Sequence, residues 1–147
     1  MRNTLKIKML SDTAHVPTRG SDYAAGYDLY ADINQLMWIP PHETVKIGTG
    51  VAVEIPHGYY GAVYARSGIA TKKMLRPGNA VGVIDEDYRG EVIVALHNDG
   101  DVPQSIEVGD RIAQLVINPY VAPEIEIVDE LDETDRGSGG FGSTGQK

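Results

Sequence analysis

The 147-residue sequence predicts an all-β domain, either a sandwich or a closed barrel such as a jelly roll. Three observations lead to this prediction. Apolar residues recur at every second position in several segments, turn signals rich in proline, glycine and asparagine recur about every ten residues, and only one segment suits a helix. Many short, evenly spaced strands separated by such turns are typical of sandwiches and barrels.

The expected strands follow this alternation along the chain. In the first of them the apolar set is Leu5, Ile7 and Met9. A further buried strand is expected to end at Val83 and Ile84, where an apolar pair precedes a run of acids. Segment 67–75 is the one place suited to a helical turn or two. The expected strands with period-two or apolar patterns are 4–9, 45–55, 61–65, 91–97, 111–117 and 124–128.

The composition changes at Asp129. Five of the seven residues from 129 to 135 are acidic, and the chain then becomes rich in glycine up to its last residue, 147. Such a segment buries too little apolar surface to offset the entropy of ordering it. We therefore expect a β-barrel domain over 1–128 and a flexible arm over 129–147.

The formal net charge of −8 argues against a protein that binds nucleic acid or an anionic membrane through its overall field. The chain has no cysteine, which excludes disulfides, thiolate zinc sites and cysteine nucleophiles. Its four histidines are far apart and are expected in turns or at the surface, without a metal role. No apolar run is long enough for a signal peptide or a membrane span, so a cytoplasmic protein is expected.

Two internal stretches have residues suited to chemistry, at places where loops are expected. Arg66, Ser67 and Gly68 combine a guanidinium group, a hydroxyl and a flexible backbone, which together suit a phosphate but also suit a plain turn. Asp85 directly follows an apolar run, and a carboxylate held there suits a general base or a metal-water shell. The same stretch also fits a solvated hairpin tip. A third expected loop with charge and glycine is 24–31.

The glycine-rich tail satisfies the dinucleotide pattern G-x-G-x-x-G over 137–142, but it lacks the strand and the helix that this fingerprint requires. Its residues still suit a phosphate: Arg136 offers a fork of donors, and Ser143 and Thr144 offer hydroxyls. Phe141, the one phenylalanine of the chain, suits stacking on a flat ring. The alternative is a disordered, solubilising tail.

Taken together and in order, these stretches resemble the five motifs of the homotrimeric dUTP pyrophosphatase (dUTPase) family. The resemblance implies a jelly-roll-like β-barrel with a flexible Gly-rich C-terminal arm. It also implies hydrolysis of dUTP to dUMP and pyrophosphate with Mg²⁺, which keeps uracil out of DNA and supplies dUMP for dTMP synthesis. The family forms homotrimers with active sites at the subunit interfaces. The matching segments are 25–31, 66–68, 78–90, 109–117 and 136–145.

The resemblance implies a catalytic role for Asp85, as the general base for the water that attacks the α-phosphorus. Asp28 would hold Mg²⁺ through a metal-bound water, since magnesium retains waters and takes substrate phosphates as ligands. The residues that would bind the phosphates are Arg66, Ser67, Gly68 and Gln114.

The same resemblance also implies which residues would bind the nucleoside. Asn79, the backbone from Val83 through Ile84 to Asp85, and Ile93 on the opposite side would read the edge of uracil. Tyr88 would pack under the deoxyribose and leave no room for a ribose 2′-hydroxyl. In the arm, Arg136 would reach the γ-phosphate and Phe141 would cover the uracil, while Gly142, Ser143 and Thr144 would follow the phosphates.

The chain departs from many relatives at one place, where Lys73 and Met74, then Arg76 and Pro77, follow segment 66–72 in place of a His-Gly pair. The length up to Asn79 is preserved. Two other functions stay open beside dUTP hydrolysis. One is a nucleotide deaminase like the related dCTP deaminases, and the other is a non-catalytic regulatory module on the same fold.

Overall fold

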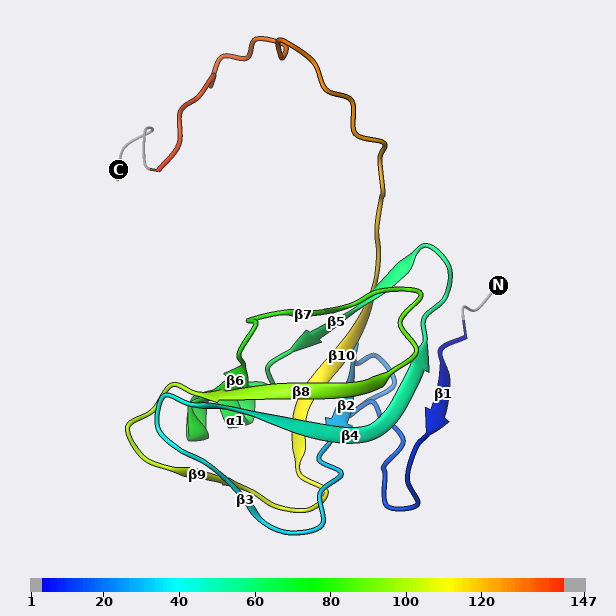
Figure 1. The fold of residues 1–147 in the computed structure, drawn as a ribbon, viewed down its shortest axis with the longest axis vertical. Helices are drawn as coiled ribbons and strands as arrows, with labels where there is room; N and C mark the ends of the chain where they lie inside the picture. Colours follow the sequence, from blue (N-terminus) through cyan, green and yellow to red (C-terminus); the bar gives the residue numbers. More distant parts are fainter. Residues whose placement is uncertain (1–3, 142–147) are drawn as a thin grey trace.

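The computed structural model describes residues 4–141, and within that range it contains ten strands and one helix (Figure 1). The elements are β1 (Lys6–Met9), β2 (Gly26–Tyr30), β3 (Met37–Ile39), β4 (Thr44–Glu54), β5 (Tyr59–Tyr64), α1 (Ser67–Lys73), β6 (Leu75–Pro77), β7 (Gly82–Ile84), β8 (Glu91–Asn98), β9 (Gln104–Ile106) and β10 (Arg111–Pro119).

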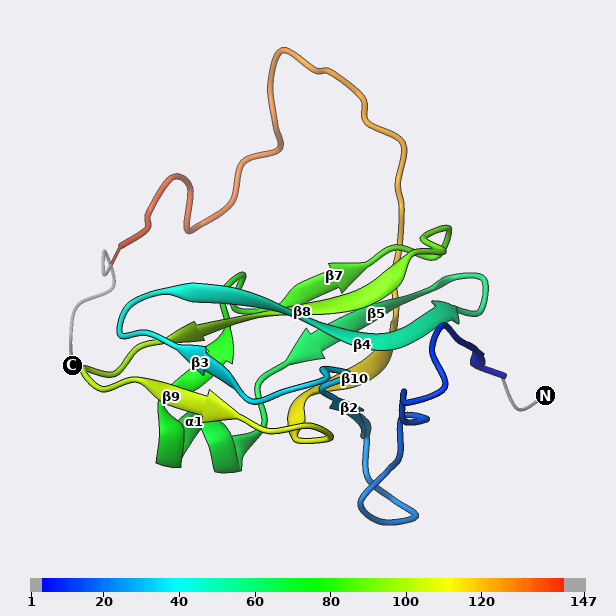
Figure 2. The same ribbon diagram turned by 60° about the horizontal axis from the view of Figure 1, so that its bottom comes forward.

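Two four-stranded antiparallel sheets form the body. One has the order β1-β4-β8-β6 and the other β2-β10-β5-β7, and a two-stranded sheet pairs β3 with β9. Figures 1 and 2 show the first sheet lying across the second. The core lies between them and is built from aliphatic side chains such as Leu29, Ile47, Val94 and Leu115. The predicted all-β, jelly-roll-like fold is confirmed.

The alternation seen in the sequence holds in the long strands. In β8 the side chains of Val92, Val94 and Leu96 are buried, while Ile93 between them is exposed. The register of β4 against β8 shifts between Gly48 and Ala52, which marks a bulge. Gly50, inside that bulge, has φ of 66°, and a Cβ there would lie 2.3 Å from Oδ2 of Asp32. Only glycine fits this position.

Two expectations about strands are wrong. Segment 124–128 forms no strand, and its side chains Ile125 and Ile127 are almost fully exposed. An alternating segment becomes a strand only when another strand pairs with it, and no strand among residues 4–141 pairs with this one. Segment 24–31, expected as a loop, contains β2, because Leu29 is buried in the core and the segment pairs with β10.

Helix α1 occupies the one segment suited to helical turns. It ends at Met74, whose backbone is left-handed with φ of 56° and ψ of 30°. Glycine is the residue that adopts such a left-handed cap without strain. The neighbouring segment is tied to the body: Lys73 donates to the carbonyl of Ser105 at 2.8 Å, and Arg76 pairs with Asp99 at 2.7 Å. Lys73 and Arg76, two of the residues at which the chain departs from the motifs it resembles, thus hold this segment to the body.

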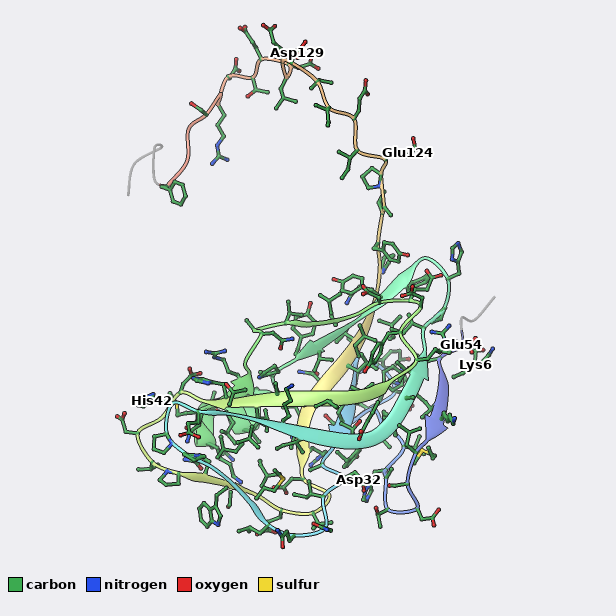
Figure 3. The ribbon with its side chains drawn as sticks, in the orientation of Figure 1. Lys6, Asp32, His42, Glu54, Glu124 and Asp129 are labelled. Atoms are coloured by element: carbon green, nitrogen blue, oxygen red, sulfur yellow. The ribbon has the colours of Figure 1, made fainter. Side chains whose placement is uncertain are left out.

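After β10 the chain leaves both sheets and runs away from them toward the arm (Figures 1 and 2). Figure 3 shows Glu124 and, at the start of the arm, Asp129, both far from the strands that carry Lys6 and Glu54. Nearly every described residue after Pro119 is exposed. Within residues 4–141, no helix is long and apolar enough to cross a membrane.

Candidate active site

One cleft contains the residues predicted to bind phosphate and metal. It has a volume of about 250 Å³ and lies where β2, β10 and the start of α1 meet. The predicted residues that line it are Asp28, Arg66, Ser67, Gly68 and Gln114. Three segments that are distant in the sequence therefore share one surface, which we call the phosphate cleft.

The carboxylate of Asp28 lies at the centre of this cleft. Arg66 donates from Nε to Oδ1 at 2.7 Å, and Arg111 donates from Nη1 to Oδ2 at 3.3 Å. The Asp28 side chain is only 13% exposed, so solvent screens these ion pairs less than it would at the open surface. Two guanidinium groups around one carboxylate leave a net positive charge, which suits an anionic ligand.

Sequence reasoning missed Arg111. A signal was present, because Arg111 lies three residues before Gln114 in the segment 109–117 that resembles the fourth motif. Its place beside Asp28 depends on the antiparallel pairing of β10 with β2, in which Arg111 lies opposite Tyr30. This long-range pairing brings the two charges together, and the local sequence does not reveal it.

Gln114 lies on β10, the strand between β2 and β5. In the sheet it lies opposite Asp28 on one side and Tyr64 on the other. Its Nε2 donates to the carbonyl of Ala65 at 2.9 Å. A Cβ at Gly26 would lie 2.4 Å from Oε1 of Gln114. Glycine at position 26 therefore leaves the space that the amide of Gln114 occupies.

Three residues predicted to bind phosphate lie at the start of α1: Arg66, Ser67 and Gly68. Arg66 is the N-cap residue with extended backbone, no side chain caps the helix, and its first turn has no acidic residue. A Cβ at Gly68 would meet nothing within 4 Å. The backbone and hydroxyl groups of this turn thus face open space in the cleft.

A second cleft, of about 210 Å³, lies between β7 and β8. These strands follow one another in the chain but belong to different sheets, since β7 pairs with β5 while β8 pairs with β4 and β6. Among the described residues, β7 is the last strand of its sheet, so its open edge carries backbone groups that a flat polar ring can use in place of a strand. We call it the nucleoside cleft. The predicted residues that line it are Asn79, Val83, Ile84, Asp85, Tyr88 and Ile93.

The walls of the nucleoside cleft correct one expectation. Val83 and Ile84 were both expected to be buried, but Val83 is 60% exposed and only Ile84 packs in the core. Strand geometry explains the difference, because successive side chains point to opposite faces. Ile93, on β8, is exposed on the opposite wall.

Tyr88 is fixed at the mouth of this cleft. Its hydroxyl donates to the carbonyl of Glu91 at 2.9 Å. A Cβ at Gly90 would lie 2.6 Å from Cζ of Tyr88, so the ring lies directly against the backbone of Gly90. Asn79 lies beside Gly82, where a Cβ would be 3.3 Å from its Nδ2. Glycines thus set the positions of both polar side chains.

Asp85 follows β7 in a turn closed by the bond from the N–H of Tyr88 to the carbonyl of Asp85, at 3.1 Å. Its carboxylate is exposed, and within residues 4–141 no hydrogen bond to it is found. The next residue, Glu86, differs: hydrogen bonds from His57 and from the N–H of Gly58 hold the pKa of its carboxyl below the ordinary value. Of these two neighbouring carboxylates, the one at Asp85 has no hydrogen bond among the described residues.

Asp85 and Arg66 lie toward opposite ends of β5. Ile84 pairs with Gly61, which places Asp85 beside Tyr60, whereas Arg66 follows the other end of the strand. Six residues of extended chain span about 20 Å. One chain alone therefore does not bring Asp85 to the phosphate cleft.

The two predicted arm residues that the structure describes, Arg136 and Phe141, line neither cleft. Arg136 donates from Nε to the carbonyl of Gly139 at 2.8 Å, in a local turn of the arm. Phe141 is fully exposed. The other predicted arm residues, Gly142, Ser143 and Thr144, lie outside the residues that the structure describes.

The acidic groups of the site suit a metal ion that brings most of its own ligands. In the part of the chain described, no three histidine or carboxylate side chains group together around a possible metal. Asp28 is the one carboxylate that lines the phosphate cleft. Magnesium commonly keeps several waters and binds substrate phosphates, so a single carboxylate fits it.

Comparison with known proteins decides the family. The family model described as dUTPase matches residues 12–145. The chain belongs to the dUTPase family. Among curated relatives, the deoxyuridine 5′-triphosphate nucleotidohydrolase of Desulfitobacterium hafniense is 49% identical over 148 residues, covering 97% of this chain and 98% of the relative.

Solved structures of family members share the fold. The Staphylococcus bacteriophage 80alpha dUTPase with dUPNHPP has a TM-score of 0.88 and 35% identity, covering 97% of this chain and 99% of that one. A mutant dUTPase from phage phi11 of S. aureus, described with a structural Mg(II) ion, has a TM-score of 0.78 and 32% identity, covering 87% and 98%.

Proposed function

We propose that this protein hydrolyses dUTP to dUMP and pyrophosphate, which keeps uracil out of DNA and supplies dUMP for dTMP synthesis. One observation carries the proposal: the body residues predicted for base, sugar and water attack line one cleft, and the body residues predicted for phosphate and metal line the other. Family membership and the nucleotidohydrolase relatives support it.

The nucleoside cleft would select uracil through backbone groups. The open edge of β7 from Val83 to Asp85 offers amides and carbonyls to the ring edge, and Asn79 adds its amide. A narrow slot excludes the methyl group of thymine. The amino group of cytosine would meet a donor and remain unpaired, which costs about 1–3 kcal/mol when it is buried. Tyr88, fixed by Glu91, would pack under the deoxyribose.

Asp85 would act as the general base. It accepts a proton from the attacking water as the water oxygen bonds to the α-phosphorus, and the bond from the α-phosphorus to the bridging oxygen breaks, so that pyrophosphate leaves. The free, exposed carboxylate of Asp85 suits this task better than the engaged one of Glu86.

The phosphate cleft would hold the triphosphate. Arg66 and Arg111 keep their guanidinium groups oriented on Asp28, while Ser67, Gly68 and Gln114 add donors. These local charges offset the net charge of −8, which is screened beyond about 8–10 Å. Asp28 would hold Mg²⁺ through a bound water. The ion would neutralise developing charge on the phosphates.

We propose a homotrimer with active sites at the subunit interfaces. The roughly 20 Å between Asp85 and Arg66 along β5 supports this arrangement, since both must reach the same triphosphate. The test mixes two inactive variants, Asp85→Asn and Arg66→Ala, after partial denaturation and reassembly. Hybrid sites with both native residues should restore activity, whereas sites confined to one chain would give no recovery.

The arm, proposed as residues 129–147 after a body of 1–128, would close over bound nucleotide. Arg136 would reach the γ-phosphate and Phe141 the uracil, with Gly142, Ser143 and Thr144 along the phosphates. Ordering the nine glycine-rich residues 137–145 of the arm costs on the order of 10 kcal/mol, so contacts with the substrate must offset this cost. A Phe141→Trp protein should change its fluorescence when a non-hydrolysable dUTP analogue binds, and unchanged emission would contradict closure.

The deciding experiment measures pyrophosphate and ammonia separately with dUTP, dCTP, dTTP and UTP. Pyrophosphate from dUTP alone is the expected result. Ammonia from dCTP would indicate a deaminase, and nucleotide binding without either product would indicate a regulatory module. Purified protein without Mg²⁺ should lose activity and recover it when the ion is restored. Location in the cytoplasm is a further proposal, tested by imaging the tagged protein in its host.

A further inference from the structure

The carboxylate of Glu86 joins three segments of the body. Its Oε2 accepts hydrogen bonds from the N–H of Gly58 at 2.8 Å and from the hydroxyl of Tyr120 at 3.1 Å. Its Oε1 lies 2.7 Å from Nδ1 of His57. The N–H of Tyr120 also donates to the carbonyl of Gly58 at 3.2 Å, which closes the cluster.

Tyr120 is the last point at which the arm is anchored. Strand β10 ends one residue earlier, at Pro119. None of the hydrogen bonds found within residues 4–141 involves residues 121–133. The direction in which the arm leaves the body is therefore set at Tyr120, by its bonds to Glu86 and Gly58.

The same carboxylate braces the turn that carries Asp85. Glu86 directly follows Asp85, and its own carbonyl accepts a hydrogen bond from Nη1 of Arg89 at 2.7 Å. Both the backbone and the side chain of residue 86 are thus held. The side chain is 26% exposed, which is low for an acid in a charged turn.

We propose that Glu86 is a positioning residue that fixes the root of the arm relative to the turn carrying Asp85. Glu86 and Tyr120 act through the arm and through Asp85, without touching substrate. An arm that closes over a site at a subunit interface must leave the body in a defined direction. The hydrogen bonds of Glu86 to Gly58 and Tyr120 fix that direction. The inference rests on the proposed dUTP hydrolysis and arm closure.

The test compares Glu86→Ala, Glu86→Gln and Tyr120→Phe, with Glu43→Ala as a matched control. Glu43 is an exposed glutamate in the turn between β3 and β4 and lines neither cleft. We expect kcat to fall about tenfold in Glu86→Ala and about threefold in Tyr120→Phe, with KM for dUTP changed less than about threefold. Glu86→Gln should recover most of the activity, because its amide oxygen still accepts both hydrogen bonds. The control should match the wild type.

A double variant separates positioning from a general structural role. If Tyr120 acts through the arm, the Tyr120→Phe penalty should shrink in an Arg136→Ala background, where the arm is already impaired. An equal penalty in both backgrounds would overturn the inference, as would wild-type kcat in a folded Glu86→Ala protein. Should Glu86→Ala fail to fold, Tyr120→Phe still decides. A wild type that releases no pyrophosphate from dUTP would instead refute the proposed function.

Discussion

The two clefts differ in how their acids are held. In the phosphate cleft, the carboxylate of Asp28 is paired with Arg66 and Arg111 before any ligand arrives. In the nucleoside cleft, the carboxylate of Asp85 has no hydrogen-bond partner among the described residues. The first arrangement keeps two guanidinium groups in place for an anion. The second leaves an acid free to take a proton, so binding and proton transfer are assigned to different surfaces.

Removing the free carboxylate should have the largest effect. In Asp85→Asn we expect kcat to fall about 10³-fold, because the general base is lost while the shape of the nucleoside cleft is kept. Binding of a non-hydrolysable dUTP analogue should stay within about threefold, measured by calorimetry. Asp87→Asn is the control, since Asp87 is an exposed acid in the same turn. Retained turnover in Asp85→Asn would refute its assignment as the base.

Removing the carboxylate of Asp28, which is paired with two arginines, should weaken the binding of both Mg²⁺ and the substrate phosphates. Asp28→Asn should raise the Mg²⁺ concentration for half-maximal activity by about 10- to 100-fold, because Asp28 would orient a metal-bound water and both arginines. The measurement is a magnesium titration of pyrophosphate release. Asp22→Asn, an exposed acid on the loop before β2, serves as the control. An unchanged titration would exclude Asp28 from the metal site.

A smaller effect is expected from crowding the phosphate cleft. Gly26→Ala places a Cβ 2.4 Å from Oε1 of Gln114 and should displace that amide. We expect KM for dUTP to rise about tenfold, with stability reduced slightly. Gly20→Ala is the matched control, because Gly20 lines the same cleft and a Cβ there meets nothing within 4 Å. Equal kinetics for the two variants would contradict a role for Gln114.

The smallest expected effect is the pH dependence of stability at His57. Its hydrogen bond to Glu86 raises the pKa of His57 and lowers the pKa of Glu86. A raised histidine pKa stabilises the fold below the ordinary value of about 6.5, and the gain is lost as pH rises through the folded pKa. The Glu86 partner stays ionised above its own ordinary value, so the pair contributes most at mildly acidic pH.

His57 is 96% exposed, so solvent screens the pair. We expect the wild type to melt about 1 °C or less above His57→Gln near pH 6, with no difference near pH 8.5. Differential scanning calorimetry at the two pH values measures this. A larger difference at the higher pH would show that the sign is wrong.

The sequence predicted the composition of both clefts better than the elements that build them. Asp28 and Asp85 were found through their motifs, yet Asp28 lies on a strand that was expected to be a loop. Ile125 and Ile127 alternate as in a strand, but they are exposed and pair with no strand of the part of the chain that the structure describes. Arg111 was missed because only the pairing of β10 with β2 brings it to Asp28. Local sequence patterns indicate which residues have suitable chemistry and which segments favour strands. Pairing between distant segments decides where those residues lie in space.

The slot between β7 and β8 has walls that belong to different sheets. Its width is therefore set by the packing of the whole core, including Ile47 and Leu115, which belong to the core and do not line the cleft. A conservative core substitution that shifts one sheet by a few tenths of an ångström would admit the wrong base while the protein still folds. Fidelity is thus the first property that a weakened interior would lose, which places selection for accurate base choice on residues that never meet the nucleotide.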